Sequence, residues 1–367
     1  MKNKLVLILT LIVAICFSLA FFTACDDTSK ESAPTDGLHY QRISGKNEYR
    51  VIGLGNSSEL EIVIDSEYNG MPVTEVDAMA FHGSKDGCAN IESVVIPDSV
   101  VTLGKEAFED CKNLKKVVLS KYLTKIDEST FKNCSMLSDI EIPSKVTEIC
   151  KSAFENCDSL VKIAIPDSVE RIGESAFSSC DKLSEVSIGK KVNFIGDRAF
   201  FYCKSMTAFT VSQDNLDFVS LDGVLYTKGY KKLVQYALGK DDHTFRVPEG
   251  VTVIGTRAFY RANKLYLIDL PNTVSIIEDG AMSYCENLQS VTLSKDLTKV
   301  GNGVFSSSEH LTDVYYKGTP LTWGKFSYGY DWETFMIKVT LYYYSAGIPQ
   351  FTGNFWYYDQ GYPAVWR

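Results

Sequence analysis

The sequence predicts a β-rich solenoid, in which coils of 23 residues stack through short parallel strands between two end caps, with one inserted β-hairpin. A phenylalanine recurs every 23 residues in mid-chain, and a cysteine follows three positions later. A period of about 20 to 50 residues is typical of stacked repeats. We expect the repeated side chains to form a structural ladder, made of Phe108, Phe131, Phe154, Phe177, Phe200, Cys111, Cys134, Cys157, Cys180 and Cys203.

Composition and charge restrict the class of protein. Hydrophobic residues make up 45% of the 367-residue chain, which excludes a disordered chain. The formal net charge is −9, and removal of a leader that contains Lys2 and Lys4 would make it more negative. This balance disfavours phosphate backbones and anionic lipid headgroups as partners. We therefore expect no nucleic-acid partner.

The N-terminus has the pattern of a secretory signal. A short basic stretch precedes the apolar run 5–22, which is followed by Thr23-Ala24-Cys25 and a polar stretch. A cysteine after two small residues resembles the lipobox of bacterial lipoproteins, although Phe22 stands where that motif usually has an aliphatic residue. The alternative is an uncleaved anchor, because the apolar run is just long enough to span a bilayer.

The lipobox resemblance implies a signal peptide over residues 1–24, diacylation of Cys25 and a flexible tether over residues 25–37. It also implies an extracytoplasmic protein that is anchored by lipid, exposed at the cell surface, and in contact with the membrane through the anchor only.

Each coil contains three recurring segments. The pattern Val/Leu-x-x-Ile/Val/Leu appears nine times, from Val73/Val76 to Leu297/Val300, and an Ala-Phe pair follows it. Next comes Leu-x-x-Val/Ile-x-Ile/Leu, whose last three residues alternate as in a half-buried strand. One coil buries too little apolar surface to offset the entropy lost on ordering, so we expect stability only from stacking.

The cysteines of the ladder are expected to be buried, reduced thiols. Stacking places equivalent residues about 4.7–4.9 Å apart, a separation that a disulfide can bridge. However, Ala262 and Ser308 replace the cysteine without disturbing the repeat. A straight column of thiols does not converge as zinc ligands must, so we expect no metal. Cys88 and Cys150 lie outside the column and are expected to be more exposed.

Two regions depart from the repeat. The spacing from Phe200 to Phe259 is much longer than one period, and residues 212–247 have the pattern of a β-hairpin around Gly229. This hairpin either extends the sheet or protrudes as a contact loop. The last residues are rich in aromatics, which predicts a cap over the terminal coil or a platform that stacks sugar rings. The tryptophans of that region are Trp323, Trp332, Trp356 and Trp366.

The full repeat, Ala-Phe-x-x-Cys-x-x-Leu-x-x-Ile-x-Ile-Pro-x-x-Val-x-x-Ile-Gly, resembles that of the BspA-like leucine-rich repeat family of bacterial cell-surface proteins. The resemblance implies a right-handed leucine-rich repeat solenoid over residues 73–316, with an N-terminal cap over 38–72 and a C-terminal cap over 317–367. It also implies surface exposure and adhesion to, or binding of, host or matrix proteins. The family contributes no catalytic residues.

Binding is the function class that the sequence favours. The four histidines share no metal spacing, and no phosphate loop, nucleophile elbow or zinc-protease motif occurs, so we expect neither an enzyme nor a cofactor. The first hypothesis is recognition of an extracellular protein by outward strand residues, and the alternative is glycan binding by the four C-terminal tryptophans. A purely structural spacer is a third possibility. The outward candidates are Lys116, Glu141, Lys162 and Glu185.

Overall fold

The computed structural model describes residues 34–350 and 352–366, which form one compact unit. The predicted signal peptide (residues 1–24), the predicted lipidation site Cys25 and most of the predicted tether lie outside this part of the chain. Within the described ranges, no helix is long and apolar enough to cross a bilayer.

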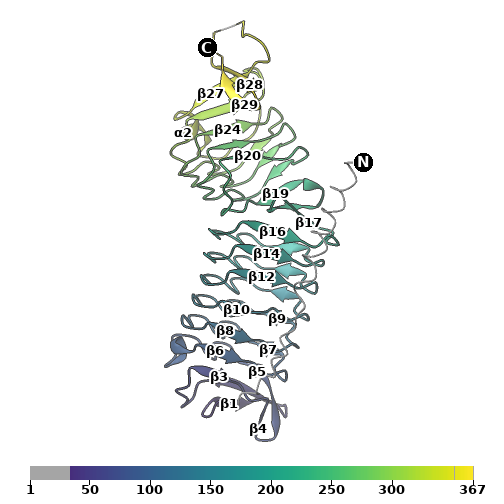
Figure 1. Ribbon diagram of the computed structural model, residues 1–367, viewed down its shortest axis with the longest axis vertical. Helices are drawn as coiled ribbons and strands as arrows, with labels where there is room; N and C mark the ends of the chain where they lie inside the picture. Colours follow the sequence, from purple (N-terminus) through teal and green to yellow (C-terminus); the bar gives the residue numbers. More distant parts are fainter. Residues whose placement is uncertain (1–33, 351, 367) are drawn as a thin grey trace, which may run out of the picture. The chain divides into compact units, whose positions relative to one another are not determined.

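One strand of each coil lies in a column that we call the front sheet (Figure 1). These strands contain the end of the Leu-x-x-Val-x-Ile segment. Before the insertion they pair in parallel as two groups, β3-β6-β8-β10 and β12-β14-β16, and in the second group Lys162 lies beside Glu185 and Ile163 beside Val186. Exposed and buried residues alternate along β12 and β14, as the sequence predicts. Before the insertion the front strands are β3 (Glu61–Val63), β6 (Ser93–Val95), β8 (Lys116–Val118), β10 (Asp139–Ile140), β12 (Lys162–Ile165), β14 (Glu185–Ile188) and β16 (Ala208–Val211).

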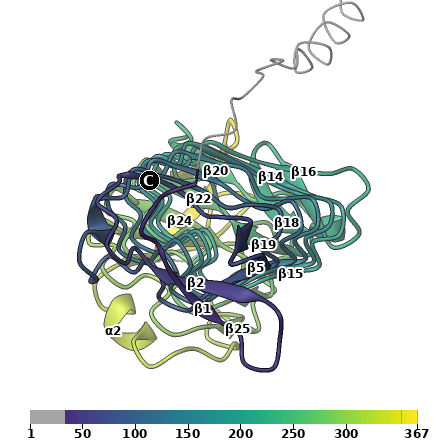
Figure 2. The same cartoon turned by 90° about the horizontal axis from the view of Figure 1, so that it is seen from below.

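A second column of parallel strands, the back sheet, contains the Val-x-x-Ile segment. Figure 2 looks along the stack and shows β14 and β16 on a different side of the coils from β5 and β15. The apolar side chains between the two columns form the core. The back strands before the insertion are β5 (Met71–Val76), β7 (Thr102–Leu103), β9 (Lys125–Ile126), β11 (Glu148–Ile149), β13 (Arg171–Ile172) and β15 (Phe194–Ile195).

The N-terminal residues close the first end of the stack. Strands β1 (His39–Arg42) and β2 (Tyr49–Gly53) form an antiparallel pair, and β2 pairs in parallel with β5 of the back sheet. Strand β4 (Glu67–Tyr68) pairs with the start of β5. The short 3-10 helix η1 (Cys88–Asn90) lies in the insertion before β6.

The third side of each coil is a series of turns that carries the Ala-Phe pair. From Phe81 to Phe177, the amide of each ladder phenylalanine donates to the carbonyl of the alanine or threonine that precedes the next one, as from Phe154 to Ala176 at 2.7 Å. The ladder rings are buried and stack from Phe81 to Phe200, with neighbouring centroids 5.1–5.6 Å apart. Main-chain bonds and ring stacking therefore use the same 23-residue register.

The thiols of the ladder have a role that the sequence analysis does not foresee. Each buried thiol donates to the carbonyl of the phenylalanine in the preceding coil, as Cys157 does to Phe131 at 3.2 Å. The same contact recurs for Cys111, Cys134, Cys180, Cys203 and Cys285. The cysteine is thus a small donor as well as a small apolar residue.

The two replacements in this column support that role. Ser308 makes the equivalent bond, from its hydroxyl to the carbonyl of Met282 at 2.9 Å. Ala262 has no donor, and the carbonyl that it would face belongs to Tyr236. That carbonyl instead accepts from the side-chain amide of Gln235 at 3.1 Å. A side-chain donor therefore satisfies this acceptor from Phe81 to Phe177 and again from Tyr236 to Met282.

The insertion is built into the stack. Strand β18 (Val224–Thr227) is antiparallel to β17 (Phe218–Leu221) and, across the 3-10 turn η2 (Lys228–Tyr230), to β19 (Lys232–Gln235). Strand β19 pairs in parallel with β21, so the hairpin supplies a back strand. Because Val224, Leu225 and Tyr226 are buried, the hairpin extends the sheet rather than protruding as a contact loop.

The coils continue after the insertion and end in a cap. The chain turns back in the antiparallel pair β28 and β29, and the helix α2 (Trp332–Met336) packs on the last coil. The front strands are β20 (Thr244–Arg246), β22 (Leu267–Asp269), β24 (Ser290–Leu293), β26 (Asp313–Tyr316), β27 (Thr340–Tyr344), β28 (Phe355–Asp359) and β29 (Tyr362–Val365), and the back strands are β21 (Val253–Ile254), β23 (Ile276–Ile277) and β25 (Lys299–Val300).

The structure confirms the predicted fold class and corrects the prediction for Cys88, which is as buried as the ladder cysteines. Cys150 is also buried, but at 9% it is more exposed than the ladder cysteines, in the predicted direction. The insertion that carries Cys88 folds against Leu54 of the N-terminal region, and the side chain of Lys125 in the preceding coil contacts the thiol of Cys150.

Replacing Cys157 by alanine removes the buried thiol donor to the Phe131 carbonyl, which keeps only the Cys134 amide as a donor. We expect the Cys157→Ala change to lower the free energy of unfolding by about 0.5–1.5 kcal/mol. Cys157→Ser, which keeps a donor as Ser308 does, should cost less. Urea unfolding of both variants measures the difference, and equal losses would contradict the proposed role of the thiol.

Burial makes the ladder thiols weak acids. It raises the pKa of Cys134, Cys157 and Cys180 well above the ordinary value, and that of Cys203 to about 12. Since the folded state disfavours the thiolate, the free energy of unfolding should fall as the pH rises from about 8.5, the ordinary thiol pKa, towards 12. Below that range none of the cysteines in the described ranges should be alkylated before unfolding. Mass spectrometry of iodoacetamide-treated protein at pH 8 tests this, and labelling of a ladder cysteine in the folded protein would refute it.

Candidate binding surfaces

The outward side chains of β8 to β16, which we call the front face, include the residues predicted to bind a protein. Lys116 pairs with Asp139 at 3.1 Å, and Lys162 pairs with Glu185 at 2.8 Å. All four side chains are at least half exposed. Such pairs contribute about 0–1 kcal/mol to stability. The charges along this column therefore largely neutralise one another.

The neighbouring outward column of the front face carries smaller side chains. Glu141 is exposed but lies just beyond the end of β10, not within the strand. Val118 is 43% exposed, and Ala164, Ser187 and Thr210 follow it as exposed residues on successive front strands. The front face is therefore a strip of small side chains beside a row of self-paired charges.

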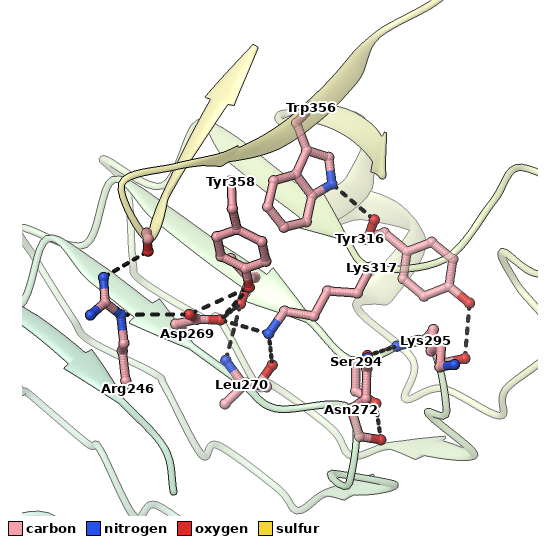
Figure 3. A network of polar contacts seen from close by, with 12 residues as sticks. Arg246, Asp269, Leu270, Asn272, Ser294, Lys295, Tyr316, Lys317, Trp356 and Tyr358 are labelled. Atoms are coloured by element: carbon pink, nitrogen blue, oxygen red, sulfur yellow. Dashed lines mark hydrogen bonds and ion pairs between the residues drawn. The ribbon is translucent and has the colours of Figure 1, made fainter. Parts of the chain in front are cut away.

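The same face is covered in the C-terminal half of the solenoid. The β28–β29 pair folds over the outward residues of β20, β22 and β24 (Figure 3). The hydroxyl of Tyr358 in β28 donates to Oδ1 of Asp269 at 3.2 Å. Arg246 donates to the Gly361 carbonyl at 2.6 Å, and its guanidinium lies 4.8 Å from the ring centre of Tyr362. The outward residues of β20, β22 and β24 are therefore less accessible to a partner than those of the front face.

Asp269 is the centre of this covered region. Its carboxylate is nearly buried and pairs with Nζ of Lys317 at 2.8 Å, and the Thr292 hydroxyl also donates to it. Lys317 donates in addition to the Leu270 carbonyl at 2.6 Å. Burial, followed by the charge of Asp269, raises the pKa of Tyr358, so this phenol remains a proton donor. The network fixes the β28–β29 pair to the coils.

The structure removes two of the predicted glycan-binding residues. Trp332 and Trp356 are buried, and Nε1 of Trp356 donates to the Tyr316 carbonyl at 3.0 Å. These rings serve the core of the cap, so the prediction that they stack on sugars is wrong. Trp323 is half-buried against the ring of Tyr316. Trp366 is half-buried against Tyr357, with ring centroids 4.3 Å apart.

Metal-ligating side chains converge at one place in the described ranges. The ligand atoms of His82, Glu106 and Glu109 lie within 4.8 Å of one another. However, the Ser84 amide donates to Nδ1 of His82 at 3.1 Å, which places the proton of the neutral ring on Nε2, the nitrogen that faces Glu109. Glu109 also pairs with Lys132 at 3.3 Å. Because metal binding would disrupt both contacts, we assign no metal site here.

Two groups of residues are missing from the sequence-based candidates. Asp269 and Tyr358 are 89 residues apart, so no local spacing indicates their contact. The second group is Arg198, Arg257 and Arg261, which the repeat pattern could have indicated. These arginines occupy repeat positions where the earlier coils carry mostly serine, asparagine, aspartate or glutamate, with Met79 and Tyr202 as exceptions.

Replacing Lys317 by methionine leaves the nearly buried carboxylate of Asp269 without its closest cation. We expect Lys317→Met to lower the free energy of unfolding by about 3–5 kcal/mol. Lys162→Met, which breaks the exposed pair with Glu185, is the matched control and should cost no more than about 1 kcal/mol. Guanidinium unfolding measures both changes. Equal losses would show that Asp269 is not held as a buried ion pair.

The chain was compared with known families, curated proteins and solved structures. It matches the family described as BspA type leucine rich repeat region over residues 74–207 and 240–338. No curated protein matches it in sequence.

Similar folds occur in solved structures. A leucine rich cell surface protein from Faecalibacterium prausnitzii is 24% identical, with a TM-score of 0.52, covering 80% of this chain and 97% of its own. A leucine-rich repeat protein from Eubacterium ventriosum is 18% identical, with a TM-score of 0.57, covering 77% and 80%. The pneumococcal vaccine antigen PcpA is 18% identical, with a TM-score of 0.56, covering 85% and 87%.

These structures support the fold alone, since all three are less than 25% identical to this chain. The family match covers more than half of the residues and includes the repeated coils described above. The chain therefore belongs to the BspA type leucine rich repeat family.

Proposed function

We propose that this chain is a cell-surface binding module that recognises an extracellular protein through the front face of β8–β16. The observation that carries the proposal is the contrast between the two halves of the front sheet. Its outward residues are exposed before the insertion, whereas the β28–β29 pair covers their equivalents around Asp269. A solenoid offers binding surfaces of this kind because neighbouring coils repeat the same outward positions.

The chemistry of the front face suits a flat protein surface. Five front strands about 4.8 Å apart give a strip roughly 20 Å long. Small side chains at Ala164, Ser187 and Thr210 allow close approach of a partner. The ion pairs beside them are already satisfied, so binding does not depend on a strongly charged partner. We therefore expect affinity to come mainly from shape and from desolvation of the small residues.

The proposed location is outside the cell membrane, with lipid attachment at Cys25. The signal-like N-terminus supports this location, as does the similarity in fold to a protein described as a cell surface protein. The alternative function, glycan binding by the C-terminal aromatics, now rests on Trp323 and Trp366, because the other two tryptophans are buried. We propose no enzymatic activity and no cofactor, since the family is a binding scaffold.

Ala164→Arg places a long charged side chain in the middle of the front face. We expect it to weaken binding to a protein partner at least tenfold, which corresponds to about 1.4 kcal/mol or more. Thr102→Arg adds the same side chain at an exposed position of β7 in the back sheet and should leave binding unchanged.

The partner is first identified by binding the purified full-length chain to immobilised extracellular-matrix and cell-surface proteins. Surface plasmon resonance then compares the two variants on that partner. Loss of affinity in both variants, or in neither, would exclude the front face as the binding surface. Circular dichroism melting curves serve as the folding control.

A further inference from the structure

The turn side of the solenoid has a gap where the hairpin is inserted. Twelve residues (173–184) join the back strand β13 to the front strand β14, but eight (236–243) join β19 to β20. The shorter link places Tyr236 at the position of the ladder phenylalanine. It turns back towards the front sheet at Gly239, whose amide donates to the Met206 carbonyl at 2.6 Å. The outer part of the turn is therefore missing in this one coil.

Side chains from the two flanking coils meet across the gap. The ring centroids of Phe201 and Tyr260 are 4.4 Å apart, and those of Tyr260 and Tyr284 are 5.2 Å apart. Nη1 of Arg261 donates to the Tyr202 hydroxyl at 3.0 Å. The gap is thus lined by aromatic rings and arginine rather than by main chain.

These residues occupy strained backbone positions. The turns before and after each Ala-Phe pair contain residues with positive φ, which small polar residues tolerate and bulky residues rarely adopt. These positions hold Met79 and Glu106 in the first coils and then small residues such as Ser152, Asn156, Ser175 and Ser179. Around the gap φ is between 52° and 60° at Arg198, Tyr202, Arg257, Arg261 and Tyr284. Because the fold accepts small residues at these positions, packing does not require the bulky ones. Backbone strain of this kind is concentrated at functional sites.

The arginines at the gap are free to bind an anion. Seven arginines lie in the described ranges, and three of them, Arg198, Arg257 and Arg261, form no ion pair within 4.0 Å there. Arg261 lies over the rings of Tyr202 and Tyr284, and its Nε is buried without a partner. The other four arginines, Arg42, Arg50, Arg171 and Arg246, are bound to side chains elsewhere.

Two carboxylates near the pocket, Asp279 and Asp331, are already hydrogen-bonded. Asp279 accepts from the main-chain and side-chain amides of Asn302 at 2.8 and 3.3 Å. Asp331 accepts from the Gly303 amide at 2.8 Å and the Ser306 hydroxyl at 3.1 Å. Neither pairs with an arginine, so unpaired positive charge remains in a chain of net charge −9.

A shallow pocket of about 420 Å³ lies beside these side chains. Its volume falls in the range of small-molecule sites, roughly 300–1,000 Å³. Guanidinium groups, tyrosine rings, an amide and the carboxylate of Asp279, which Asn302 neutralises in part by hydrogen bonds, surround it. Tyr330 is 86% exposed at its edge. The lining residues that matter here are Arg198, Arg257, Tyr260, Tyr284, Asn302 and Tyr330.

We propose that this pocket binds an acidic sugar residue of an extracellular glycan. Arg198 and Arg257 would hold the sugar carboxylate, for which guanidinium is the preferred partner. Tyr260 and Tyr284 would contact the apolar face of the ring, and the tyrosine hydroxyls and the Asn302 amide would bind sugar hydroxyls. The volume and the many neutral hydrogen-bonding groups favour a saccharide over an acidic peptide. The pocket lies on the turn side, so the proposal does not depend on the front face.

The test is calorimetric titration of the purified full-length chain with trigalacturonate, a carboxylated trisaccharide, and with the neutral trisaccharide galactotriose. We expect trigalacturonate to bind and galactotriose to bind at least tenfold more weakly. Arg198→Gln and Arg257→Gln should each weaken trigalacturonate binding at least tenfold. Arg171→Gln, at an exposed position in the back sheet, is the matched control and should bind as the unchanged chain does.

The Tyr284→Ser variant tests the contact between the tyrosine ring and the sugar separately from the charge of the two arginines. Serine occupies the equivalent position at Ser179 and Ser307, so this variant should remain folded, keep both arginines and still bind at least tenfold more weakly. Absence of trigalacturonate binding, equal binding of galactotriose, or unchanged binding by the Arg198 and Arg257 variants would overturn the proposal. Equal binding of a tetraglutamate peptide would assign the pocket to an acidic peptide instead.

Discussion

The stack depends on one repeated contact, the hydrogen bond from a buried side chain to the carbonyl at the ladder phenylalanine position of a neighbouring coil. The turn that buries the aromatic ring also directs this carbonyl into the core, where an unpaired acceptor would be destabilising. A thiol is small and apolar enough for the space and still donates, which explains why cysteine recurs with phenylalanine. Ser308 and Gln235 show that the requirement is for a donor rather than for sulfur.

The sequence predicts the coils well because every repeated position is determined by its neighbours 23 residues away. The burial of Phe154 and Cys157 follows from the period alone. The contacts that the sequence analysis misses involve residues far apart in the chain, such as Asp269 with Tyr358, or folded insertions, such as that of Cys88. For the same reason it places Trp332 and Trp356 among the ligand candidates, since composition does not show which ring the cap encloses.

The hairpin insertion divides the molecule functionally as well as structurally. Before it, the front face has exposed small residues, and after it the β28–β29 pair covers that face through Asp269. On the turn side, the shorter link between β19 and β20 replaces main chain by aromatic and arginine side chains. The two proposed binding surfaces therefore lie on different sides of the coils, and one partner could be bound without blocking the other.

The bond from Gln235 to the Tyr236 carbonyl has a consequence for how such chains change in length. A duplicated or deleted coil of 23 residues preserves every donor and acceptor, because each cysteine meets a new but equivalent carbonyl. The insertion that carries Cys88 keeps its pair, because the Cys111 thiol still donates to the Phe81 carbonyl, whereas Gln235 supplies the donor where Ala262 follows the hairpin. Recombination within the repeats should thus be tolerated in whole coils, and irregular inserts should survive where the thiol keeps its carbonyl or a nearby side chain replaces it.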